Sequence, residues 1–164
     1  MCGTEHAGLA TVFRSDAPES WFGASDAERS VGELNVNVCA FRVPDGFRTF
    51  LRGHLVIPVR DPAITEVIHS IWAEIAEADM VRYVQNVKDG QPTLLPPFTG
   101  RLNSRMPQYA TPSLGLKVGV VDRHGDVPLL LLNRDQDHPL VCEQVDGITL
   151  HKVWQLNEPW LESP

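Results

Sequence analysis

The sequence predicts an α+β fold with a mostly antiparallel sheet of about five to seven strands and two main helices. The strands are predicted by runs of β-branched and apolar residues that alternate with short turn signals. The helices are predicted by apolar residues at helical spacing over 77–88 and after residue 149. The 164 residues fit a single domain, with a loop-rich segment over 1–32 and an α+β core over 33–158.

The N-terminal third contains the first predicted hairpin. Residues 15–30 have the composition of a loop, with one helical turn at most, begun by Ser25. The β-rich segment 38–43 leads into the turn 44–46, where proline presets one dihedral angle and glycine tolerates a positive φ. The apolar run 47–59 then returns alongside it.

Residues 64–75 fit two structures. Their apolar residues recur at helical spacing, which alone predicts a helix buried on one face. Their β-branched and aromatic residues, such as Ile71 and Trp72, also suit a central strand, which need not alternate cleanly when both faces are buried. The segment 77–88 is the clearer helix, because acidic residues begin it and a glycine-containing turn ends it.

The C-terminal half continues the pattern of short strands. Residues 98–103 predict a strand, and 114–121 and 127–133 predict a second hairpin. Pro128 is expected at a sheet edge or outside the ladder, because proline cannot donate a ladder hydrogen bond. Residues 140–145 are expected to form another strand.

The last predicted element is a helix that Thr149 caps and Pro159 ends. Its apolar stripe includes Trp154, which we assign to the core together with Trp72. Trp21 and Trp160 lie among turn residues, where an exposed tryptophan would indicate a partner surface.

Composition narrows the partners and the compartment. Fourteen basic and 21 acidic residues leave a net charge of -7, which disfavours nucleic acid and anionic membrane surfaces as partners. The longest apolar run, 128–132, is too short to span a membrane, and no secretory signal is readable. Three widely spaced cysteines favour a reducing compartment. We therefore expect a cytoplasmic protein, with its oligomeric state open.

Familiar catalytic signatures are missing from the sequence, which disfavours an enzyme without ruling one out. One constellation has the residue types for proton transfer, because Asp137 and His138 lie close to Glu143 in the chain. No nucleophile is tied to them, so a loop histidine bonded to a nearby carboxylate is the competing interpretation. Arg52 and Asn103 complete a set of candidate ligand-binding residues.

Several short motifs follow one another in order along nearly the whole chain. They are Cys2-Gly3-x-x-His6-x-Gly8-Leu9, Asp16-Ala17-Pro18, Arg52-Gly53-x-Leu55-x-Ile57-Pro58-Val59, Asp137-His138-Pro139-Leu140, Glu143-Gln144 and Gly147-Ile148-Thr149-Leu150. This order resembles the bacterial family called domain of unknown function 2199. The resemblance favours a strand over 64–75 and implies no activity.

The resemblance also implies a small zinc-binding element built from two cysteine pairs. This chain keeps Cys2 of the first pair and Cys39 of the second, while Gly32 stands where the third cysteine is expected. A structural zinc site needs four ligands. We therefore expect the isolated protein to hold no zinc, and we expect no other cofactor.

Two functions remain. The leading one is a small acidic protein-binding module, of the immunity or accessory type, which acts by covering a partner, since acidic surfaces steer toward basic partners. The alternative is an enzyme or small-ligand binder with a polar pocket around Arg52, Asn103, His138 and Glu143. Convergence of these four side chains in one concave site, with a shifted pKa, would favour the alternative.

Overall fold

The computed structural model describes residues 8–90 and 93–161, without the side chains of residues 160 and 161. It confirms the α+β class and corrects the details. The sheet is mixed and has eight strands, and the described residues form five helices, two of them short. In chain order the elements are β1 (Val12–Arg14), α1 (Glu19–Gly23), α2 (Asp26–Ser30), β2 (Glu33–Leu34), β3 (Val38–Val43), β4 (Gly46–Pro58), β5 (Glu66–Ile75), α3 (Glu77–Lys88), β6 (Phe98–Leu102), β7 (Lys117–Arg123), β8 (Asp126–Leu132), α4 (Pro139–Asp146) and α5 (Leu150–Leu161).

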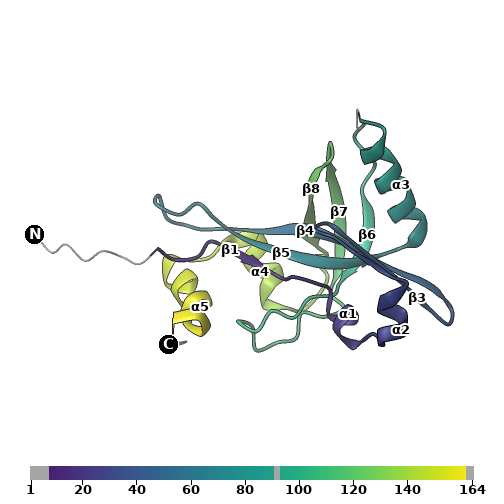
Figure 1. Cartoon of the computed structure of the whole chain (residues 1–164). Coiled ribbons are helices and arrows are strands. Elements are labelled where there is room, and N and C mark those ends of the chain that lie inside the picture. The colour runs from purple at the N-terminus through teal and green to yellow at the C-terminus, as the bar shows by residue number, and fades with distance from the viewer. Residues whose placement is uncertain (1–7, 91–92, 162–164) are drawn as a thin grey trace, which may run out of the picture.

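A long antiparallel hairpin of β4 and β5 is the base of the sheet. Its register runs from Thr49 opposite Ile75 to Pro58 opposite Glu66. In Figure 1 this ribbon crosses the molecule, with α3 toward one end and α5 toward the other. The strand prediction for 64–75 is confirmed. The helical spacing misled because β5 is buried along most of its length on both faces.

Five strands close into a barrel, since β5, β6, β7, β8 and β4 pair in succession and β4 returns to β5. Each long strand changes its outer partner along its length. β5 pairs with β1 in parallel through Ser70 and with β6 from Ala73, and β4 pairs with β3 up to Leu51 and with β8 at His54. The parallel contacts of β1 and β8 make the sheet mixed rather than mostly antiparallel.

Two apolar layers lie on opposite faces of the β4–β5 ribbon. The barrel interior forms the larger core, to which α3 contributes Met80 and α5 contributes Leu156. A smaller cluster of Cys39, Phe41, Phe50 and Trp72 is joined by Trp21 of α1. Because side chains of a strand alternate between faces, these residues lie outside the barrel and are covered by the N-terminal segment.

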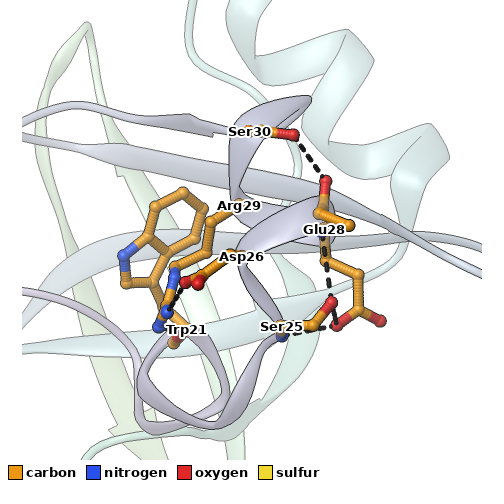
Figure 2. A network of polar contacts seen from close by, with 7 residues as sticks. Trp21, Ser25, Asp26, Glu28, Arg29 and Ser30 are labelled. Atoms are coloured by element: carbon orange, nitrogen blue, oxygen red, sulfur yellow. Dashed lines mark hydrogen bonds and ion pairs between the residues drawn. The ribbon is translucent and has the colours of Figure 1, made fainter.

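The helical turn expected at Ser25 is confirmed as α2. The Ser25 backbone N–H donates to Glu28 Oε2 at 2.7 Å, and the Glu28 N–H donates to Ser25 Oγ at 3.2 Å, which completes a capping box. Arg29 pairs with Asp26 at 2.6 Å and donates to the Trp21 carbonyl at 3.4 Å (Figure 2). Such contacts stabilise a helix of five residues that would be marginal in isolation.

The strand predicted over 140–145 is wrong, because these residues form helix α4. Its start is well specified: His138 is the N-cap, accepting from the Leu140 N–H, and Pro139 occupies the first turn. Gln144 then bonds the β8 backbone, accepting from the Leu132 N–H at 2.8 Å and donating to the Leu130 carbonyl at 2.9 Å. These hydrogen bonds to β8 hold residues 140–145 as a helix, although their apolar content suits either a helix or a strand.

Two smaller expectations are also corrected. Trp154 is 40% exposed, because the buried face of α5 consists of Val153, Leu156 and Asn157. Pro159 lies inside α5, which continues to Leu161; near a helix end, proline removes a single backbone bond. The expectation for Pro128, by contrast, is confirmed: it lies within β8 at the irregularity where the pairing with β7 shifts register, and it has no partner in the ladder.

We predict that barrel closure makes Gly100 sensitive to a side chain. A Cβ there would lie 2.7 Å from the Glu74 carbonyl oxygen, a backbone atom that cannot move aside. Gly100→Ala should therefore lower the free energy of unfolding by about 1–3 kcal/mol. Gly119→Ala in the neighbouring strand is the control, because its nearest atom is 3.9 Å away. Equal urea-unfolding midpoints for the two variants would contradict this account of closure.

Candidate functional site

Arg52 is a nearly buried cation on the outer face of β4. Its exposed fraction is 2%, and its guanidinium lies over the Trp72 ring at 4.7 Å from the centroid. Nη2 donates to the Asp16 carbonyl at 3.3 Å, whereas Nε and Nη1 have no partner among the described residues. Burial lowers the Arg52 pKa, and nearby Arg14 lowers it further while Asp16 opposes this. Arg52 thus links the N-terminal segment to the hairpin.

Asn103, which follows β6, organises the same N-terminal segment. Its carbonyl accepts from the Glu19 N–H at 2.7 Å and its Oδ1 accepts from the Ser20 N–H at 2.9 Å. These bonds cap α1, whose own N-cap residue, Pro18, makes no side-chain cap bond. Arg52 and Asn103 are therefore brought to one segment, residues 16–20, where both hold the backbone.

His138 and Glu143 form a second group, around α4. His138 Nε2 lies 3.2 Å from the Thr111 carbonyl, and its Nδ1 caps α4. Glu143 accepts from the Tyr109 hydroxyl at 2.7 Å and faces Lys152 Nζ at 3.5 Å. Burial raises the Tyr109 pKa, and the Glu143 carboxylate raises it further, so this phenol stays protonated.

The four candidate residues are thus found in two groups. None of the five main hollows on the described residues is lined by Arg52, Asn103, His138 or Glu143. Asp137, the fifth candidate, is exposed. Each of the four has a structural contact instead. Asn103 and His138 cap helices, Arg52 stacks on Trp72, and Glu143 accepts from Tyr109 and pairs with Lys152.

His69 is a buried titratable residue outside the set of five candidates. It is 1% exposed, stacked on Phe13 with centroids 5.3 Å apart, and in edge contact with Tyr109 at 6.1 Å. Burial lowers its pKa to about 4. The available signal was its position two residues from Val67 and Ile71, on the inward face of a buried strand.

The residues of this chain do not fit the zinc element that the family resemblance implies. Cys39 is fully buried, and burial raises its thiol pKa to about 12, whereas zinc binds the thiolate. At Gly32, the direction of a Cβ is filled by Trp21 at 2.9 Å and Phe41 at 3.0 Å. The described residues contain no group of three or more potential metal ligands, and Cys2 lies outside them.

We predict that a chelator leaves the protein folded. The outer face is packed by aromatic side chains around Cys39, so its stability does not depend on a bound ion. The melting temperature with excess EDTA should equal that without it, and metal analysis of the isolated protein should find well under one zinc per chain. A drop in melting temperature on chelation would disprove this.

We predict a pH dependence of stability from His69. Its pKa in the folded chain, about 4, lies below the ordinary value of 6.5, so below about pH 6.5 the unfolded chain binds a proton that the folded chain does not. The unfolding free energy is therefore unaffected by His69 above about pH 6.5 and decreases as the pH falls toward 4. At pH 5 the decrease is about 2 kcal/mol.

His69→Phe keeps the aromatic stack and removes the titration. The wild type should lose about 2 kcal/mol more unfolding free energy than this variant between about pH 7 and pH 5. His151→Gln, at an exposed position of α5, is the control and should follow the wild type. Parallel pH profiles for the wild type and His69→Phe would refute the assignment.

No described helix has the length and apolar content needed to cross a bilayer.

The family comparison agrees with the motifs. A search of curated proteins and one of solved structures found no match. A family model described as an uncharacterized protein conserved in bacteria matches residues 1–148. The chain therefore belongs to this bacterial family, DUF2199.

Proposed function

We propose that this chain is a protein-binding module of the immunity or accessory type, which acts by covering a basic partner. The observation that carries the proposal is a groove of about 300 Å³ between the β2–β3 corner and α3. Its lining comes from the corner, from one face of the helix and from the β7–β8 turn: Glu33, Asn35, Asn37, Val38, Tyr83, Val84, Val87, Lys88 and Gly125.

Apolar side chains are exposed along this groove and beside it. Val87, in the lining, is 41% exposed, and Leu34 and Val36 of the corner are 38% and 61% exposed. Covering apolar surface stabilises a complex by about 25 cal/mol for each Å² removed from water. Neighbouring exposed apolar residues that flank a groove are typical of a protein-binding surface.

Carboxylates near the groove and the net charge of the chain favour a basic partner. Burial raises the pKa of Tyr83, and the nearby carboxylates of Asp122 and Asp126 raise it further, which indicates that both acidic groups lie near this part of the groove. The lining itself carries one carboxylate, Glu33, and one cation, Lys88. With a net charge of -7, the chain would steer a partner that presents an apolar side chain flanked by lysine or arginine.

The structural contacts of the predicted polar residues also favour a module over an enzyme. Asn103 and His138 cap helices, and Glu143 is engaged by Tyr109 and Lys152. These contacts account for the three side chains without a bound substrate.

We predict that Val36→Arg abolishes partner binding without unfolding the chain. Val36 is 61% exposed and lies in the chain between Asn35 and Asn37 of the groove lining, so the change adds a cation beside the groove and disturbs no core. Val145→Arg, at a 49% exposed site on α4, is the matched control. In pull-downs from the source-organism lysate, wild type and Val145→Arg should retain a partner that Val36→Arg loses.

The partner should then be purified and titrated calorimetrically. Val36→Arg should weaken its affinity at least about tenfold, the effect of losing a central contact, and added salt should weaken wild-type binding. The proposal fails if no protein is retained, or if the two arginine variants bind the partner alike.

A further inference from the structure

A hollow of about 630 Å³ lies on the outer face of the barrel, over β5, β6 and β7. Buried and outward-facing positions alternate along these strands, and the outward-facing positions of the lining are Glu74, Thr99, Arg101, Lys117, Gly119 and Asn133. The volume falls in the range of small-ligand pockets, about 300–1,000 Å³. The hollow shares no lining residue with the groove between the β2–β3 corner and α3, so the two sites are separate.

Two cations lie side by side in this hollow. The register places Arg101 of β6 opposite Lys117 of β7, and neither takes part in an ion pair among the described residues. Arg101 donates from Nη1 to the Gly115 carbonyl at 3.2 Å, which holds the guanidinium beside the sheet. Glu74 lies opposite Arg101 on β5, but its two oxygens accept from Arg48 at 2.8 and 2.7 Å. Because like charges directly opposite each other destabilise a sheet, an anion between the two cations would be favoured.

Gly119 supplies the open space next to the cations. It lies on the same face of β7 as Lys117 and opposite Thr99 of β6. A Cβ at Gly119 would meet only the Leu131 carbonyl oxygen, 3.9 Å away, so packing does not require a glycine here. Glycine in a strand interior costs about 0.5–1 kcal/mol relative to alanine, and it often marks a place where a ligand approaches the backbone. The fold thus leaves an unfilled strand position beside two cations.

We propose that this hollow binds the phosphate monoester of a small molecule that carries hydroxyl groups. The phosphate lies between Arg101 and Lys117, and the organic part lies over Gly119 against the Thr99 hydroxyl, which can both donate and accept. Two cations match the nearly double negative charge of a phosphate monoester at neutral pH better than the single charge of a carboxylate. Arginine holds phosphate oxygens in pairs, and lysine adds a point charge.

Glycerol 3-phosphate, inorganic phosphate and glycerate are the test probes. In calorimetric titration of the full chain near neutral pH, glycerol 3-phosphate should bind with a millimolar dissociation constant. Inorganic phosphate should bind about tenfold more weakly, because it cannot reach the Thr99 hydroxyl, and glycerate about tenfold more weakly, because it carries less charge. Equal affinity for any two of these three probes would overturn the proposal, as would the absence of saturable binding by glycerol 3-phosphate.

Lys117→Gln tests the cation pair. Lys117 is exposed, so the change should leave the melting temperature unaltered while it weakens glycerol 3-phosphate binding at least about tenfold. Arg123→Gln is the matched control, because it removes the same charge from an exposed position of the same strand outside the hollow. This control should bind like the wild type. If the two variants bind alike, the charge of the whole chain governs binding and the proposal fails.

Gly119→Val tests the space without removing a charge. A β-branched side chain suits a strand and has room at this position, so the melting temperature should not fall. The valine side chain should fill the space beside Thr99 and lower the affinity for glycerol 3-phosphate to the level of inorganic phosphate. A folded valine variant that still prefers the ester would refute the assignment.

Discussion

The pairing of β4 with β5 is the constraint on which the rest of the structure depends. Both strands carry two partners on their outer edges, so the barrel and the flanking strands share one ribbon. The barrel closes tightly over this ribbon: a Cβ at Gly53 would lie 2.5 Å from Cγ of Leu130 in β8. A residue without a side chain lets β8 approach β4 this closely.

The N-terminal segment depends on the outer face of the same ribbon. Trp72 donates its indole N–H to the Ser15 carbonyl at 3.1 Å, and Arg52 stacks on that indole. Beside Gly32, where the family resemblance implies a cysteine of the second pair, Trp21 and Phe41 pack against each other with centroids 5.8 Å apart. Aromatic packing and backbone hydrogen bonds therefore supply the order that metal ligation provides in small zinc elements.

Buried polar side chains in this fold differ in whether their hydrogen bonds are complete. Asn157 bonds both the N–H and the carbonyl of Ala10, which ties α5 to the chain before β1. Gln144 likewise bonds two backbone groups of β8, the Leu132 N–H and the Leu130 carbonyl. His69 and Gln108 lack such bonds in the described chain, and an unbonded buried polar atom costs about 1–3 kcal/mol. The fold tolerates this cost here, as it does at Nε and Nη1 of Arg52.

Local chemistry in the sequence by itself determined the hairpin turns, the cap at Ser25 and helix α3, because each depends on residues a few positions apart. It also marked Arg52 and His138 as candidate ligand-binding residues. Only the tertiary structure decided that residues 140–145 are helical and that the candidate residues separate into two groups. Those outcomes depend on docking between segments far apart in the chain, which periodicity and spacing do not encode.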